Sequence, residues 1–175
     1  MDDLYRRIVS QRGSVENLLR RIPGFEGYLE MTARRQADRM MREHVATLLR
    51  QQLARLANIE KMLLDAGGLS YMSKTRSVKT KFQTFVDRVA TDSPGYSGFF
   101  DAIRIGLDDL TIIYSFDEAL LRYVDQFREK LDALQEAASK NEGVDESIRA
   151  LDVLTIEAND AYSLREDVLK GIHQE

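Results

Sequence analysis

The sequence of 175 residues contains no cysteine and no tryptophan, and only two prolines and two histidines. Without cysteine the chain cannot form disulfides, thiolate metal sites or a cysteine nucleophile, and no feature favours an oxidising compartment. A carboxylate-bridged di-iron bundle needs a glutamate three positions before histidine, and neither His44 nor His173 has one there. We therefore predict neither a metal site nor a cofactor.

Long apolar runs are missing as well. The best uncharged, mostly apolar run in the body of the chain covers residues 110–116, between two aspartates, whereas a membrane-spanning helix needs about 20 residues. The chain begins Met1-Asp2-Asp3 and lacks the positive charge and apolar segment of a signal peptide. These features predict a soluble, cytoplasmic protein without a transmembrane segment.

Signatures of common enzyme sites are also absent. The phosphate-binding patterns Gly-x-Gly-x-x-Gly and Gly-x-x-x-x-Gly-Lys do not occur, and no serine has the flanking glycines of Gly-x-Ser-x-Gly. Two carboxylates, Asp109 and Asp117, fall close to the apolar face of a predicted helix, where an unpaired charge would be costly. Ion pairs with arginines of the second predicted helix explain them better than catalysis does, so an enzyme is the least favoured class.

What the sequence has in abundance is helix-forming residues with helical periodicity. Apolar residues recur three, four or seven positions apart in five segments, and turn-forming residues separate these segments. The predicted helices cover residues 3–21 (with a break or kink considered at Gly13), 26–67, 73–90, 98–140 and 145–171. The fourth is the most apolar and is expected to be central. We predict an all-α, elongated antiparallel bundle with coiled-coil character, in a single domain over residues 1–175.

A six-residue pattern occurs twice, 71 positions apart, and each copy precedes a long predicted helix. The copies are Pro23-Gly24-Phe25-Glu26-Gly27-Tyr28 and Pro94-Gly95-Tyr96-Ser97-Gly98-Phe99. The repeat is consistent with duplication of a helical hairpin, with halves at 1–70 and 71–140 followed by the helix at 145–171. The favoured interpretation is structural, because proline blocks a helix, glycine permits positive φ and aromatic rings fill gaps between helix ends. The alternative is a rigid turn whose aromatic residues contact a partner: Phe25, Tyr28, Tyr96 and Phe99.

These turns also carry a resemblance. Together with Arg34-Arg35 and the segment from Ser93 to Ile103, they resemble an uncharacterised family of bacterial all-helical proteins with repeated Pro-Gly-aromatic-x-Gly-aromatic turns. The resemblance extends over residues 22–42 and 93–127, about a third of the chain. It implies a helical fold, and it transfers no catalytic residue, because no activity is attached to that family.

Charge is distributed unevenly around a net value of −4. Residues 1–82 contain 16 Lys and Arg against 9 Asp and Glu, whereas residues 83–175 contain 9 against 20, so the two segments carry +7 and −11. We predict that these segments neutralise each other within or between chains. The net negative charge would also repel polyanions at long range.

Five arginines of the second predicted helix form the main candidate for a charged contact. Four of them fall within about 80° of one another at 100° per residue, with Arg34 nearby; the four are Arg35, Arg39, Arg42 and Arg50. The favoured interpretation is a solvated helix edge, paired with Glu30, Asp38, Glu43 and the acidic flank of the fourth predicted helix. The alternative is a contact with phosphate or lipid headgroups.

Two main hypotheses for function follow, and neither includes a small-molecule ligand. The favoured one is a non-enzymatic interaction or scaffold protein that self-associates or docks another protein. The alternative is a peripheral binder of anionic membrane or nucleic acid, which would use the arginine stripe. An enzyme built from the two aspartates and these arginines is the least favoured.

Overall fold

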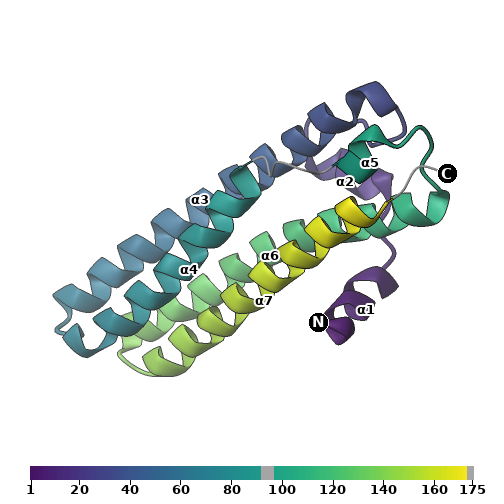
Figure 1. Cartoon of the computed structure of the whole chain (residues 1–175). Helices are drawn as coiled ribbons and strands as arrows, with labels where there is room; N and C mark the ends of the chain where they lie inside the picture. The colour runs from purple at the N-terminus through teal and green to yellow at the C-terminus, as the bar shows by residue number, and fades with distance from the viewer. Residues whose placement is uncertain (92–96, 173–175) are drawn as a thin grey trace.

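The computed structural model describes residues 1–91 and 97–172, which form helices joined by short irregular segments with no strand among them (Figure 1). Two 3-10 turns, η1 (Met31–Ala33) and η2 (Leu69–Tyr71), precede α3 and α4. The predicted all-α bundle is confirmed. The described residues form seven α-helices, whereas five were expected. Their bounds are α1 Asp2–Ser10, α2 Val15–Arg21, α3 Arg34–Asp65, α4 Met72–Ala90, α5 Ser97–Asp101, α6 Leu107–Lys140 and α7 Val144–Gly171.

Four long helices form an elongated bundle of two antiparallel hairpins, α3–α4 and α6–α7 (Figure 1). The hairpins lie side by side, with α3 packed on α4 and α6, and α7 packed on α4 and α6. In this arrangement α3 runs parallel to α6, and α4 runs parallel to α7. The core between them includes Phe82 of α4 and Phe127 of α6, whose rings stack with centroids 4.2 Å apart. Helix α6 also contacts α1 and α2, in keeping with its expected central position.

The helix predicted over residues 3–21 is not continuous, because the chain breaks between α1 and α2, at the position of Gly13 where a break or kink was considered. Gly13 approaches α6 so closely that an added Cβ would lie 2.2 Å from the backbone nitrogen of Ser115. The backbone N–H of Gly13 donates to Ser115 Oγ (2.7 Å), and that of Ser14 donates to the Glu118 carboxylate (2.7 Å). Two donors that a continuous helix would use are therefore bonded to α6 instead.

The two longest helices begin later than predicted, and one buried arginine explains both differences. Arg34, the first residue of α3, donates from Nε to the carbonyl of Tyr28 (2.9 Å) and from Nη1 to the carbonyl of Ala102 (2.5 Å). These carbonyls accept from a side chain rather than from a helical backbone. Residues 22–30 therefore stay irregular, and the helix predicted over 98–140 is divided into α5 and α6 by residues 102–106.

The two copies of the repeated turn differ where they can be compared. In the first copy Gly27 has a φ of +87°, as the structural interpretation expected. In the second copy residues 94–96 lie outside the described residues, and Gly98 is helical within α5. A Cβ on Gly98 would lie 2.4 Å from the carbonyl oxygen of Ile172, so this glycine permits close approach to the end of α7. The proposed duplication stays a prediction.

Candidate functional site

Two aspartates and two arginines form a buried charge cluster inside the bundle, comprising Asp38 and Arg42 of α3, Asp117 of α6 and Arg165 of α7. Each of the four is at most 2% exposed. Arg165 lies between the aspartates and donates from Nε to Asp117 (2.7 Å) and from Nη2 to Asp38 (2.6 Å). Arg42 donates from Nε to the other oxygen of Asp38 (2.7 Å). Because the formal charges of the cluster cancel, it meets the main condition for burying ions.

Neutral groups extend the buried charge cluster to the remaining parts of the bundle. The hydroxyl of Tyr28 donates to Asp117 Oδ2 (2.5 Å), and the backbone N–H of Tyr28 donates to the hydroxyl of Tyr114 (3.1 Å). Arg42 Nη1 donates to the carbonyl of Val89 near the end of α4 (3.2 Å). The cluster thus connects all four long helices with the irregular segment that precedes α3.

The two aspartates of the cluster are perturbed in opposite directions. Burial raises the pKa of Asp117, and the single guanidinium beside it, with the Tyr28 hydroxyl, does not fully offset this effect. Burial also acts to raise the pKa of Asp38, but the charges of Arg165 and Arg42 outweigh it and lower that pKa. Burial alone would lower the pKa of Arg165, yet its two carboxylate partners raise it well above the usual value. The two carboxylates therefore differ in pKa because Asp38 has two arginine partners and Asp117 has one.

The geometry of the buried charge cluster favours a structural role over catalysis. The charged groups face one another at hydrogen-bond distance, and their low exposure leaves no route for a substrate while the bundle stays closed. The predicted pairing of Asp117 with an arginine of the second predicted helix is wrong, since its partner is Arg165 of α7. Asp109 is half-buried in the first turn of α6 and outside the cluster.

The arginines predicted as a stripe do not share one surface. Arg34 and Arg42 are buried in the contacts described above. Arg35 is exposed, pairs with Asp101 (3.4 Å) and has its guanidinium carbon 4.7 Å from the centre of the Phe100 ring. Arg39 donates to Glu43 (2.8 Å), and Arg50 is exposed without an ion pair to any residue that the structure describes. Arg35, Arg39 and Arg42 thus pair with acidic side chains, but only Arg35 and Arg39 lie on a solvated edge, because Arg42 is buried.

The aromatic residues of the repeated turns pack inside the protein wherever they are described. Phe25, Tyr28 and Phe99 are each at most 2% exposed. The Tyr28 ring makes edge-to-face contacts with Phe25 and Phe99, at centroid distances of 5.4 and 5.1 Å. Tyr96 lies outside the described residues. The three described rings are therefore inaccessible to a partner, and the Phe99 ring centre lies 5.8 Å from the Arg34 guanidinium carbon.

Exposed apolar side chains occur instead in the segments at the end of the bundle where α3 and α6 begin. We call this set the apolar end, and it consists of Leu29, Met31, Ile103 and Leu107. Leu29, Ile103 and Leu107 are 71%, 68% and 79% exposed. Periodicity does not indicate it, because the pattern predicts all four residues within helices, whereas α3 begins only at Arg34 and α6 only at Leu107.

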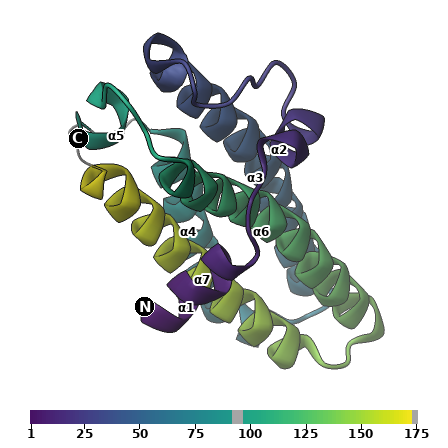
Figure 2. The ribbon, with the colours of Figure 1, turned by 90° about the vertical axis from the view of Figure 1, so that its right-hand side faces the viewer.

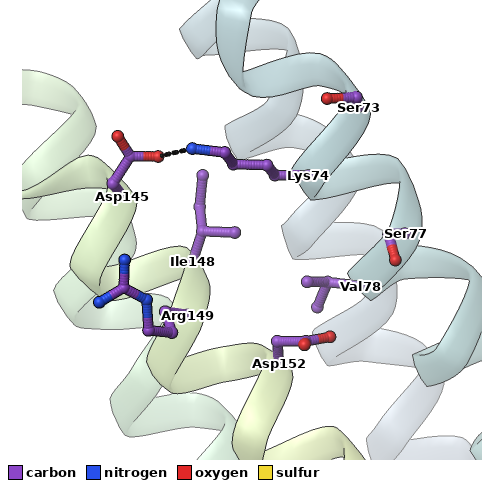
Figure 3. Close-up of a pocket in the computed structure, with 8 residues that line it drawn as sticks. All are labelled: Ser73, Lys74, Ser77, Val78, Asp145, Ile148, Arg149 and Asp152. Carbon is purple, nitrogen blue, oxygen red and sulfur yellow. Dashed lines mark hydrogen bonds and ion pairs between the residues drawn. The ribbon is translucent and has the colours of Figure 1, made fainter.

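A groove of about 360 Å³ lies between α4 and α7 at the opposite end of the bundle (Figure 3). Lys74 of α4 bonds Asp145 of α7 at 2.5 Å across it, and the floor is formed by Val78 and Ile148. The other lining residues are Ser73, Ser77, Arg149 and Asp152. Two cations and two anions leave the groove without a preferred charge, so it singles out no class of ligand.

Within residues 1–91 and 97–172, no group of three or more histidine, aspartate or glutamate side chains is arranged to hold a metal ion. No helix in the described part of the chain is long and apolar enough to cross a membrane.

Arg165 is the functional-site residue that sequence reasoning missed, although a signal for it exists. It follows Ala158 and Ala161 by seven and four positions and therefore falls on the apolar face of α7. Asp38 and Arg42 occupy the same kind of position on α3. Asp38 lies three residues before Met41 and seven before Val45, and Arg42 lies three before Val45 and seven before Leu49. Charged residues at core positions on three helices are the pattern of a buried ionic network.

Comparisons with known proteins add no further constraint. No family model, no curated protein and no solved structure matches the chain. The resemblance to a bacterial helical family accordingly stays a prediction. The interpretation of the site depends on the chain's own geometry: a buried charge cluster that ties the bundle together, and the apolar end beside it.

Proposed function

We propose that this chain is a non-enzymatic helical interaction protein that self-associates through the apolar end. The observation that carries the proposal is the exposure of Leu29, Ile103 and Leu107, each of which leaves more than two thirds of its surface to solvent. Large apolar side chains gathered at one site on a surface are typical of protein contacts, whereas single exposed leucines are common everywhere.

The apolar end is held together by the Arg34 side chain. One guanidinium bonds the carbonyls of Tyr28 and Ala102, which directly precede Leu29 and Ile103 in the chain. The two irregular segments therefore lie next to each other, and their exposed side chains extend from a rigid, buried anchor. Such pre-ordered contacts lose little conformational entropy when they bind.

The charges around the apolar end support a second copy of the chain as its partner. Exposed groups of both signs lie next to the apolar side chains in sequence, namely Glu30, Arg35, Asp101, Arg104 and Asp108. A two-fold symmetric interface buries the same patch from both subunits, so it must be complementary to itself. A patch with both charges meets this condition, whereas a patch of one sign would repel its copy.

The alternative, a contact with anionic membrane or nucleic acid, receives less support. It requires a continuous set of available arginines, but Arg34 and Arg42 are buried and Arg35 and Arg39 bond acidic side chains. The opposite net charges of residues 1–82 and 83–175 are also partly neutralised within the chain, because cations of the first segment pair with anions of the second. Such pairs are Arg7–Glu157, Arg21–Asp125, Arg55–Asp132, Lys74–Asp145 and Lys81–Asp152.

Sedimentation of the full chain over a wide concentration range tests the proposal. We expect reversible association that is weakened by the double substitution Leu29→Glu, Ile103→Glu. The matched control is Leu69→Glu, because Leu69 is also 71% exposed but lies at the opposite end of the bundle. Equal association of the wild type and both variants would exclude the apolar end as the contact, and a monomer at all concentrations would exclude self-association.

Titrations with anionic vesicles and duplex DNA at low and moderate salt test the alternative on the same material. Binding that falls steeply with salt and is lost in Arg35→Glu, Arg39→Glu would favour an anionic surface over self-association. We expect no such binding.

A further inference from the structure

Helix α1 is a short helix at the periphery of the described structure. It projects from the side of the bundle, where it packs on α6 and α7 (Figures 1 and 2). Ile8 is its single fully buried residue. Leu4, Tyr5 and Val9 are partly buried against the core, and the Tyr5 ring lies 5.8 Å from that of Phe116 between centroids. An ion pair between Arg7 and Glu157 (2.6 Å) adds a polar contact.

Hollows border α1 where it meets the bundle. One of about 180 Å³ is lined by Ile8 together with Ala119 and Tyr123 of α6. Another, of about 620 Å³, is a groove between α6 and α7 beside Arg7, and its apolar lining includes Val153 and Leu154. Packing around α1 is therefore incomplete beside these two hollows.

The connection from α1 to the bundle is strained at one residue. Arg12 has a φ of +40°, a conformation that disfavours side chains with a Cβ, whereas the next residue, Gly13, is fixed against α6 by its hydrogen bond to Ser115. The turn that folds α1 back onto its own chain is therefore held against a local preference. Opening of this turn would relieve the strain and leave α2 in place. Short hinges under strain favour exchange of an element between copies.

We infer that α1 exchanges between two copies of the chain, so that the α1 of each copy occupies the α6–α7 groove of the other. An exchanged helix makes the same contacts as in the closed monomer, so exchange sacrifices no bonding outside the hinge. A nine-residue helix is also too short to persist alone in water, which makes a docked α1 necessary in either form. This inference concerns a surface different from the apolar end and does not depend on it.

The absence of cysteine makes a direct test available. One chain carries Arg7→Cys and a second carries Glu157→Cys, which places single thiols on the two sides of the α1 contact. The two are mixed in urea, refolded together at high concentration and treated with a short bismaleimide. We expect a covalent heterodimer, because in an exchanged dimer the thiol on α1 of one chain faces the groove of the other.

The matched control pairs Arg7→Cys with Asp145→Cys, whose thiol replaces a side chain that bonds Lys74 on the α4 side of α7. This pair should give only the weak cross-linking caused by collision. Heterodimer no more abundant than in this control would overturn the inference. If Leu29→Glu, Ile103→Glu then abolished the remaining association, the apolar end alone would be responsible and the proposed function would stand.

Two hinge variants test the cause of the exchange. Arg12→Gly removes the cost of positive φ and should weaken the exchanged dimer about tenfold per chain. Arg12→Pro fixes φ near −65° and removes the N–H that bonds the carbonyl of Val9 (3.1 Å), so the closed turn cannot form and the dimer should become tighter. A monomeric Arg12→Pro protein with wild-type helix content would contradict the inference. Unchanged cross-linking in Leu29→Glu, Ile103→Glu would show that exchange operates without the apolar end.

Discussion

Opposite charges are paired in two contrasting regions of this molecule, the buried charge cluster and a ladder of solvent-accessible pairs between α4 and α7. In the cluster the charged side chains are at most 2% exposed, whereas those of the ladder are 17–56% exposed. The ladder consists of Lys74–Asp145 (2.5 Å), Lys81–Asp152 (2.7 Å) and Arg88–Glu166 (3.1 Å). Pair distances overlap between the two regions, so the difference in their contributions must come from solvent.

Ion pairs of the ladder contribute to helix register, whereas those of the cluster contribute mainly to the stability of the fold. The first two pairs of the ladder are seven residues apart on α4 and also on α7. This equal spacing favours one parallel register of the two helices, although each pair contributes little to stability. Each exposed pair can be lost without leaving a charge out of water. In the cluster, loss of one member leaves the others buried and uncompensated. The cluster therefore tolerates substitution far less than the ladder does, although the pair distances in the two regions are similar.

The largest effect is expected for Arg165→Met, which removes the shared partner of Asp38 and Asp117. The free energy of unfolding should fall by about 3–5 kcal/mol, because Asp117 keeps the Tyr28 hydroxyl but no cation. Urea unfolding followed by circular dichroism measures this loss. The double variant Arg165→Met, Asp117→Leu removes both charges and should recover much of it, while Asp38 and Arg42 stay paired. A loss below about 1 kcal/mol for the single variant would place the cluster in the same class as the ladder.

A smaller effect is expected when a neutral donor is removed from the buried charge cluster. Tyr28→Phe leaves one oxygen of Asp117 without its bond from the hydroxyl and should cost about 1–3 kcal/mol. Tyr123→Phe is the matched variant, since its hydroxyl donates to Glu157 (2.8 Å), a carboxylate whose side chain is 35% exposed. Water can replace that bond, so its loss should be smaller. Equal losses in chemical denaturation would mean that burial does not distinguish the two carboxylates.

The sequence predicts helices well where local signals decide them. Helix α4 begins one residue before the predicted start at Ser73, and α7 begins one residue before the predicted start at Asp145. Both follow turns rich in glycine or asparagine, and both keep their apolar period to the end. The starts of α3 and α6 were misplaced because they depend on a tertiary contact, the Arg34 side chain that bonds Tyr28 and Ala102.

The candidate site was predictable only in part, for a related reason. Periodicity places Asp38, Arg42 and Arg165 on apolar faces, but it does not say which faces meet or which charges pair. The pairing of Asp117 with Arg165 requires α6 and α7 to pack at a particular register, and that is set by the whole core. The apolar end was not predictable from periodicity, because its residues lie in segments whose patterns read as helix.

Asp117 and Asp38 should change the stability of the protein in opposite directions as the pH falls. The folded-state pKa of Asp117 is raised, so protonation favours the folded form as pH falls from neutral toward about 4, the unfolded value. The folded-state pKa of Asp38 is lowered, so its stabilising contribution is present above about pH 4 and is lost below it. In urea unfolding, the stability deficit of Asp117→Asn relative to wild type should therefore grow between pH 7 and 4. The deficit of Asp38→Asn should shrink below pH 4, and parallel profiles for both variants would contradict the assigned directions.

The smallest effect belongs to the ladder. Lys81→Ala removes a pair whose side chains are 40% and 31% exposed, and the coupling measured in a double-mutant cycle with Asp152→Ala should be about 0.2–1 kcal/mol. This coupling should shrink toward zero in about 1 M salt, where the screening length falls to roughly 3 Å. Coupling across the buried charge cluster, measured by Arg165→Met with Asp117→Leu, should change little in the same salt, because ions cannot enter the bundle. If salt reduced both couplings by the same fraction, solvent would have access to Asp117, and the cluster would have to be counted among the surface pairs.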